Sequence, residues 1–169
     1  MKKQLLFLLF ALLALCASAA PNDVFSVGDI TYSVTLDSYS GRPGIVAVKS
    51  LSAQGKAKTS LKLDIPGVVS YNGYKYKVGV INYDAFKGQS NISVVQIRYN
   101  ITRIAQSAFE NCTSLTTVYL PSSLTNVGYR AFGGCTALRS VYYANATPSS
   151  TSVVPGSFPE NSGMTLYVS

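Results

Sequence analysis

Two cysteines, Cys112 and Cys135, occupy the same place in two similar phrases, AFENCTSL and AFGGCTAL. Their thiols could form a disulfide or supply two ligands to a metal ion. If the phrases are stacked copies of one unit, both side chains point in the same direction, which fits the narrow Cβ geometry of a disulfide poorly. Two cysteines without a histidine are also an incomplete zinc site. We therefore favour a role for both as small buried residues of the core.

The sequence contains no histidine, and this absence restricts its chemistry. It removes the commonest general base, the commonest metal ligand and every Ser-His or Cys-His catalytic pair. The seven carboxylates form no recognisable pair of the kind that a glycosidase uses. Motifs of the types G-x-S-x-G and H-E-x-x-H, phosphate loops and dinucleotide fingerprints are also missing. We therefore predict that the protein is not an enzyme and has no catalytic residues, cofactor or metal site.

Tyrosine is the residue type best suited to bind a ligand here. Three tyrosines stand at matching places in the short segments TVYL, SVYY and TLYV, so in strands their rings point away from the core. Rings flanked by hydroxyl groups suit contact with sugar rings or with the side chains of a partner. Alternatively, cross-strand tyrosine pairs only stabilise a half-exposed sheet. The predicted ligand-binding face comprises Gln96, Thr117, Tyr119, Ser140, Tyr142 and Tyr167.

The segments that carry these residues recur with a period of 23. Phe86, Phe109 and Phe132 follow this interval, and each is preceded by alanine. Within each unit, L-x-x-V-x-L alternates as a strand with one buried face does. A unit this short cannot bury its apolar side alone, so the units must stack. We predict a mainly β solenoid with a ladder of parallel strands about 4.8 Å apart and the phenylalanines on the opposite wall.

The segment LPSSLTNVGYRAFGGCTALRSVYY resembles the BspA-type leucine-rich repeat, I-P-x-x-V-x-x-I-G-x-x-A-F-x-x-C-x-x-L-x-x-V-x-L. The resemblance extends over roughly residues 65–143. In the first copy, Gln89 replaces the usual cysteine and Arg98 replaces the usual turn proline. Because the family is common in secreted and surface proteins of Bacteroidetes, the resemblance implies a leucine-rich-repeat fold and a role in adhesion.

The first residues are typical of a secretory signal peptide. Two lysines at the start precede an apolar run, and the segment ends in the small residues ASAA. We predict a signal peptide over residues 1–19, which implies export to the medium, the cell surface, the periplasm or the outer membrane. Cys16 could mark a lipoprotein, but the bulky Leu15 precedes it where small residues are usual. No later stretch is long and apolar enough for a transmembrane helix.

The rest of the chain divides into two parts. Residues 20–66 alternate around a Gly41–Gly44 turn and are predicted to form an N-terminal antiparallel β cap. Residues 67–169 are predicted to contain the repeats, beginning with a hairpin at Asn72-Gly73 and ending with an irregular strand in TLYVS. This last strand could leave a sheet edge open for pairing with another chain.

The predicted mature chain carries a net positive charge that is unevenly distributed. Without Lys2 and Lys3, 12 cations exceed 7 carboxylates by 5, and the cations concentrate between residues 42 and 87. A nucleic-acid partner is excluded by the absence of a reading motif in an exported chain. We predict a non-catalytic protein that uses the outward face of its sheet to bind a host or microbial surface protein or glycan. The alternative is a structural role in a surface complex, including self-association through the open edge.

Overall fold

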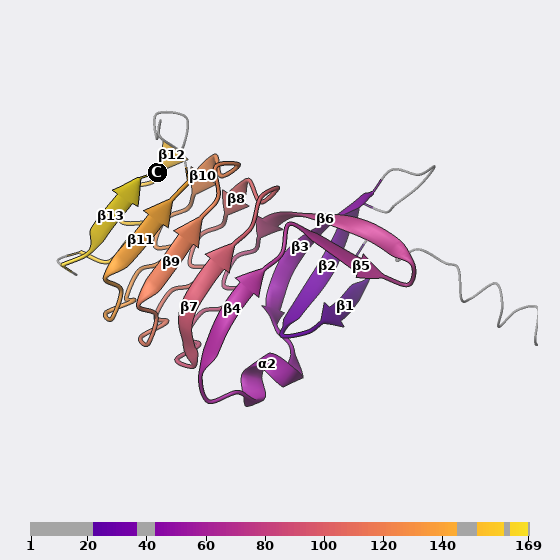
Figure 1. Ribbon diagram of the computed structural model, residues 1–169, viewed down its shortest axis with the longest axis horizontal. Helices are drawn as coiled ribbons and strands as arrows, with labels where there is room; N and C mark the ends of the chain where they lie inside the picture. Colours follow the sequence, from indigo (N-terminus) through magenta and orange to yellow (C-terminus); the bar gives the residue numbers. More distant parts are fainter. Residues whose placement is uncertain (1–21, 37–42, 145–151, 161–162, 169) are drawn as a thin grey trace, which may run out of the picture.

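The computed structural model describes residues 22–36, 43–144, 152–160 and 163–168 (Figure 1). The predicted signal peptide and Cys16 lie outside these residues. Nearly all of the described regular structure is β, with one short helix, α2 (Ala53–Ala57). No helix among the described residues is long and apolar enough to cross a membrane. The fold is therefore mainly β, as predicted.

Five parallel strands form a sheet that we call the ladder sheet. Each strand hydrogen-bonds to the next along the solenoid, in the order β13-β11-β9-β7-β4. The core-facing residues Val95, Val118 and Val141 are fully buried and pair in register. This confirms the predicted ladder and the inward columns. The strands are β4 (Leu61–Ile65), β7 (Ile92–Ile97), β9 (Thr117–Leu120), β11 (Ser140–Tyr143) and β13 (Thr165–Val168).

A second sheet covers the N-terminal end of the molecule and continues along the opposite wall of the solenoid (Figure 1). Its strand order is β1-β2-β3-β6-β8-β10-β12, and β5 pairs with β6. The strands near the N-terminus are long and largely antiparallel, whereas those on the solenoid are two residues long and parallel. The strands are β1 (Val24–Val27), β2 (Ile30–Leu36), β3 (Gly44–Leu51), β5 (Val68–Tyr71), β6 (Tyr74–Ile81), β8 (Arg103–Ile104), β10 (Asn126–Val127) and β12 (Ser152–Val153).

The N-terminal strands confirm the predicted antiparallel cap, with one difference in its extent. Strands β2 and β3 pair antiparallel, and β5 and β6 form the hairpin around Asn72-Gly73. Strand β4 lies within residues 20–66 but pairs in parallel with β7. The reason is its sequence LKLDI, whose alternate residues Leu61, Leu63 and Ile65 are buried in the same way as those of a repeat strand. The ladder therefore begins before residue 67.

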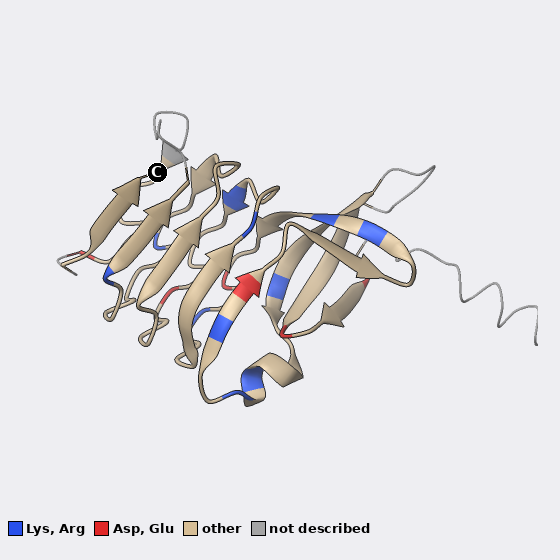
Figure 2. Cartoon of the chain, in the orientation of Figure 1, with Lys and Arg blue, Asp and Glu red and all other residues tan. Residues whose placement is uncertain are grey.

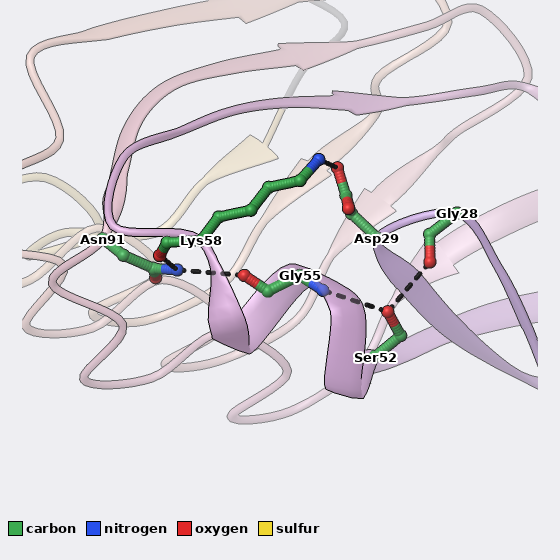
Figure 3. A network of polar contacts seen from close by, with 6 residues as sticks. All are labelled: Gly28, Asp29, Ser52, Gly55, Lys58 and Asn91. Atoms are coloured by element: carbon green, nitrogen blue, oxygen red, sulfur yellow. Dashed lines mark hydrogen bonds and ion pairs between the residues drawn. The ribbon is translucent and has the colours of Figure 1, made fainter.

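Helix α2 connects the cap to the first repeat. Ser52 caps the helix by accepting a hydrogen bond from the Gly55 N–H at 3.2 Å, and its hydroxyl donates to the Gly28 carbonyl at 2.8 Å (Figure 3). On the other side, Asn91 Nδ2 donates to the carbonyls of Gly55 (3.1 Å) and Lys58 (2.9 Å). The helix is thus hydrogen-bonded at once to the cap and to the loop that precedes β7.

The phenylalanines form a continuous stack on the wall opposite the ladder sheet. The ring centroids of Phe86 and Phe109 are 5.0 Å apart, and those of Phe109 and Phe132 are 5.1 Å apart. All three rings are fully buried. Phe158, which stands outside the 23-residue period, adds a fourth ring 5.1 Å from Phe132. The stack confirms the predicted role of these residues and extends it into the irregular C-terminal segment.

A charged cluster lies on the loops beside this stack. The carboxylate of Glu110 accepts bonds from Lys87 Nζ at 2.8 Å and from a terminal guanidinium nitrogen of Arg130 at 2.6 Å. Glu110 is 7% exposed, so few waters compensate its charge. The hydrogen bond from Lys87 is the main cause that lowers the pKa of Glu110 to about 2 from its ordinary 4.5, and Ser107 and Arg130 add to it. The cluster thus links three successive repeats through one carboxylate.

This pKa predicts how stability depends on pH. Because the folded-state pKa lies below the unfolded value, the cluster stabilises the fold above about pH 4.5 and loses that contribution as pH falls toward 2. At pH 6 we expect Glu110→Gln to lower Tm by about 2–4 °C, which corresponds to roughly 1 kcal/mol, because Lys87 and Arg130 are 45% and 46% exposed and solvent screens the cluster from their side. Thermal unfolding from pH 2 to pH 7 measures the effect. The difference between wild type and variant should vanish at the acid end; a constant difference would contradict the assignment.

Candidate binding face

The predicted outward column is assembled by the register of the ladder sheet. Tyr119 pairs with Tyr142, and Tyr142 pairs with Tyr167. On the other side Tyr119 pairs with Gln96, which pairs with Asp64 of β4. The sheet thus brings together the four predicted residues of this column and adds Asp64, which the sequence analysis did not include. Asp64 could have been identified from the sequence, because LKLDI alternates like the other ladder strands.

The tyrosine rings form a regular stack on the surface, which we call the tyrosine ladder. The ring centroids of Tyr119 and Tyr142 are 4.8 Å apart with an interplanar angle of 11°, and those of Tyr142 and Tyr167 are 4.6 Å apart at 12°. The three residues are 40%, 36% and 45% exposed, respectively. Parallel strands hold equivalent residues one strand spacing apart, and this spacing is close to the separation of stacked rings. The ladder is therefore a direct product of the repeat period.

The two predicted hydroxyl residues, Thr117 and Ser140, belong to a second column that runs beside the first. Thr117 pairs with Ser140, and Ser140 pairs with Thr165. Thr117 and Ser140 are half-buried, and no charged side chain stands next to them in their own strands. Toward β4 the column continues with Val94 and then Lys62. The predicted hydroxyl groups therefore do flank the tyrosine ladder, in a strip that becomes charged only at the cap.

An open groove of about 490 Å³ lies along one side of the tyrosine ladder. It follows the ends of the strands and the loops that leave them. At its cap end, Arg98 holds Asp64 with two parallel hydrogen bonds, Nε to Oδ1 at 2.8 Å and a terminal nitrogen to Oδ2 at 3.0 Å. The side chains that line it include Gln96, Arg98, Tyr99, Tyr119, Tyr142 and Tyr167.

The stacking decides which parts of the rings can contact a ligand. Tyr142 lies between two other rings, so both of its faces are covered. What the ladder presents to the solvent and to the groove is a row of ring edges, each ending in a phenolic hydroxyl that can donate and accept hydrogen bonds. Tyr167 stands on β13, beyond which no described strand continues the ladder sheet. The site is thus suited to an extended ligand rich in hydrogen-bonding groups.

The cysteines take no part in this face. Cys112 and Cys135 are free and fully buried, and their thiols donate to the carbonyls of Phe86 and Phe109, each at 3.1 Å. The contact with Cys135, together with burial, raises the pKa of the Cys112 thiol. The described residues contain no group of three or more side chains able to hold a metal ion. Both cysteines lie in the core column where the sequence analysis placed them.

A ladder of parallel strands built from 23-residue units, with stacked phenylalanines behind it, is the architecture of a leucine-rich-repeat protein. The BspA type leucine-rich repeat region matches residues 74–164 in six copies. The chain therefore belongs to the BspA-type leucine-rich repeat family, as the repeat phrase indicated. Nothing in this match indicates an enzyme.

Solved structures agree with this assignment. A leucine-rich repeat protein from Bacteroides capillosus is 26% identical, with a TM-score of 0.68, over 86% of this chain and 98% of that one. A leucine-rich repeat protein from Bacteroides ovatus is 28% identical, with a TM-score of 0.59, over 85% of this chain but only 37% of that one.

A more distant structure shares the fold alone. It is a leucine-rich cell surface protein from Faecalibacterium prausnitzii, 19% identical with a TM-score of 0.54, over 87% of this chain and 47% of that one. No curated protein is significantly similar to the chain.

Proposed function

We propose that the protein is an exported, non-catalytic adhesion protein that binds a host or microbial surface protein or glycan with the outward face of its ladder sheet. The observation that carries the proposal is the tyrosine ladder. Three large aromatic side chains stay half-exposed next to an open groove, in a fold whose core already buries the phenylalanine stack and the inward residues of the ladder sheet. Tyrosine is enriched at binding surfaces because it offers much contact area with little rotamer entropy to lose.

The groups beside the ladder support a polar, extended ligand. Gln96 supplies an amide at the cap end, and Arg98 and Asp64 supply a guanidinium and a carboxylate that already hold each other in place. Planar polar groups next to aromatic edges can bind sugar hydroxyls or the backbone and side chains of a peptide. Fixed geometry reduces the entropy that binding costs. The face is therefore organised before a ligand arrives.

Removing two rings of the ladder tests the proposal. We expect Tyr119→Ala combined with Tyr142→Ala to abolish capture of glycans or matrix proteins on arrays, because both rings line the groove. The thermal stability should stay near that of the wild type, since both side chains lie on the outward face of the sheet, 40% and 36% exposed, and not in the core. If stability and capture fell together, the ladder would instead serve to stabilise the sheet.

A matched control uses a tyrosine elsewhere on the surface. Tyr83 is 60% exposed and lies outside the groove and the ladder sheet, next to Arg103. Tyr83→Ala removes the same side chain and should leave capture unchanged. The pair Tyr119→Phe and Tyr142→Phe keeps the rings but removes the hydroxyls, so it separates hydrogen bonding from ring contact.

A second candidate function is assembly through the edge of the ladder sheet. It is supported by β13, whose four residues are all exposed. Exposed edge strands offer unpaired backbone groups to other chains. Light scattering of the purified protein distinguishes this candidate, because a strict monomer at high concentration would argue against it.

A further inference from the structure

Strand β13 differs from the other strands of the ladder sheet in the exposure of its core-side residues. Leu166 and Val168 pair in register with Val141 and Tyr143, which are 0% and 5% exposed. Leu166 itself is 54% exposed and Val168 is 47% exposed. Within the described residues, no strand pairs with the outer side of β13. Among the described residues, the last layer of the core is therefore covered on one side only.

The opposite edge of the same sheet is protected. Strand β4 carries the charged residues Lys62 and Asp64 on its outward face, and its apolar residues are at most 2% exposed because the cap covers them. Charged side chains and covering elements are two ways in which proteins prevent edge pairing. The sequence of β13, TLYV, has no charge and no proline. In the part of the chain that the structure describes, one edge of the sheet is thus protected from pairing and the other is not.

The backbone of β13 shows which groups are available for pairing. The Thr165 N–H donates to the Arg139 carbonyl at 2.8 Å, so Thr165 directs its peptide groups toward β11. Because peptide groups alternate along a strand, Tyr167 does the same, whereas Leu166 and Val168 direct their N–H and C=O groups toward the open side. The two exposed apolar residues are thus also the two with outward-facing backbone groups.

We propose that β13 pairs antiparallel with β13 of a second copy of this chain, around a two-fold axis between the two Tyr167 residues. This inference rests on the assembly role proposed above and specifies its partner and its register. In this register Leu166 lies opposite the partner's Val168, and Val168 lies opposite the partner's Leu166. Both pairs have outward-facing backbone groups, so each exchanges two hydrogen bonds. An isologous contact of this kind closes after two copies.

The same register continues both faces of the sheet. On the core side, the apolar pairs cover the end of a cavity of about 220 Å³ that is lined by side chains such as Leu124, Tyr143, Phe158 and Met164. On the outward side, Tyr167 and the partner's Tyr167 form a non-hydrogen-bonded pair, with Cα atoms about 4.5 Å apart. This separation is close to the 4.6 Å between the rings of Tyr142 and Tyr167. The two tyrosine ladders would therefore join into one ladder of six rings.

The charge distribution favours contact at this end of the molecule. Among the described residues after Arg139, Glu160 is the one charged side chain. The cations gather on the cap and the first repeats, as Figure 2 shows. Two copies joined through β13 therefore keep their basic caps at opposite ends, beyond the range at which salt leaves a strong repulsion. A dimer formed through the caps would instead bring the two basic surfaces together, where they repel each other.

Sedimentation of the purified protein over a wide range of concentration tests the proposal. We expect a monomer–dimer equilibrium, and we expect Leu166→Lys to raise the dimer dissociation constant by at least about tenfold, because it places a charge in the centre of the contact. Leu166 is already half-exposed, so the lysine stem can lie along the surface without unfolding the strand. The control Thr165→Lys adds the same charge outside the central pairs and should change the constant far less.

Cross-linking tests the register itself. The central pair brings residue 167 of both copies within the Cα range of a disulfide, so Tyr167→Cys should give a covalent dimer under mild oxidation. Thr165 is also exposed and lies on the same face, but it is not opposite itself in the partner, so Thr165→Cys should cross-link poorly. Cross-linking that favours residue 165 would overturn the register. A strict monomer, or growth into filaments, would overturn the two-fold contact.

These outcomes are separable from those of the ligand-binding proposal. Leu166 lies on the core side of β13 and does not line the groove. If Leu166→Lys is monomeric but still captures its ligand, binding by the tyrosine face and dimerisation through β13 are both upheld. A protein that forms the dimer but captures nothing would refute the binding function alone, and a monomer that captures its ligand would refute the dimer alone.

Discussion

Replacing Phe109 by alanine is expected to lower the free energy of unfolding by about 3–5 kcal/mol, one of the two largest effects of a single substitution that this structure predicts. The Phe109 ring is fully buried and lies between two other rings, 5.0 Å from Phe86 and 5.1 Å from Phe132. Its removal therefore leaves a cavity with an aromatic face on each side. For a chain of this size the loss corresponds to a fall in Tm of about 6–20 °C.

The backbone explains why this cavity cannot close. We call the turn that carries each phenylalanine a corner. Each corner is hydrogen-bonded to the next one: the Phe86 N–H donates to the Ala108 carbonyl and the Phe109 N–H donates to the Ala131 carbonyl, both at 2.7 Å. These bonds fix the spacing between neighbouring corners. If the neighbouring rings moved inward, their backbones would have to break the same bonds. The cost should thus lie toward the upper end of the range for large-to-small substitutions.

A graded series checks the explanation. Phe158 stands at the end of the stack, is only half-buried and contacts the single ring of Phe132. Phe158→Ala should therefore cost clearly less than Phe109→Ala, and Phe109→Leu should fall between wild type and Phe109→Ala. Urea unfolding of the three variants measures these differences. Equal costs at the centre and the end of the stack would mean that the stack does not stabilise the solenoid as a column.

The repeat period explains why much of this fold could be predicted from the sequence. Residues 23 apart, such as Val118 and Val141, lie side by side once the strands are parallel. The inward and outward columns can therefore be assigned from the residue numbers. The same interval brought Tyr119 and Tyr142 together. The stacking of their rings, and hence the covering of the ring faces, depends on side-chain rotamers that no spacing rule specifies. The sequence therefore predicted which residues lie side by side on the outward face, but not how their rings are oriented.

One variable position of the repeat, which follows each phenylalanine by two residues, is restricted by the backbone conformation. Gly88, Asn111 and Gly134 are equivalent residues of successive units, with φ of 71°, 60° and 71°. Only glycine and, less readily, asparagine adopt this left-handed conformation at low cost. The alternation of these two residue types at one place in the repeat is thus a backbone requirement of the corner that follows each phenylalanine. It could have been identified from the sequence.

Other features lacked a local signal. The second sheet continues from the cap onto the solenoid through strands of two residues, such as Arg103–Ile104, which are too short to show an alternating pattern. Helix α2 is five residues long and depends on its Ser52 cap and on hydrogen bonds from Asn91. Both features are imposed by contacts between segments far apart in the chain. Local periodicity cannot reveal contacts of this kind.

Replacing Gly67 by alanine is expected to cost at least about 3 kcal/mol, because the backbone of a neighbouring loop occupies the place of the added methyl group. A Cβ at Gly67 would overlap the carbonyl oxygen of Tyr99 and lie 2.9 Å from its carbonyl carbon. The loop is held where it is, since Asn100 Nδ2 donates to the Gly67 carbonyl at 3.1 Å and the Arg98 N–H donates to Ile65 at 3.0 Å. The added methyl group therefore clashes with backbone atoms, and hydrogen bonds prevent either segment from moving away.

Gly79→Ala is the matched control. Gly79 lies within β6, its φ is not in the left-handed range, and an added Cβ would meet only a side-chain methyl of Ile45 at 3.4 Å. The same chemical change should be neutral there or stabilise the protein by up to about 1 kcal/mol through the entropy of the unfolded chain. Thermal unfolding of both variants measures the contrast.

The consequences of Gly67→Ala should extend beyond stability. Arg98 and Tyr99, which belong to the loop that the methyl group displaces, line the groove beside the tyrosine ladder. If the groove binds the ligand, Gly67→Ala should weaken capture even at temperatures where the variant is fully folded, whereas Gly79→Ala should not. Unchanged capture by folded Gly67→Ala would show that the cap end of the groove, with Arg98 and Asp64, lies outside the binding site and that the tyrosine ladder binds without it.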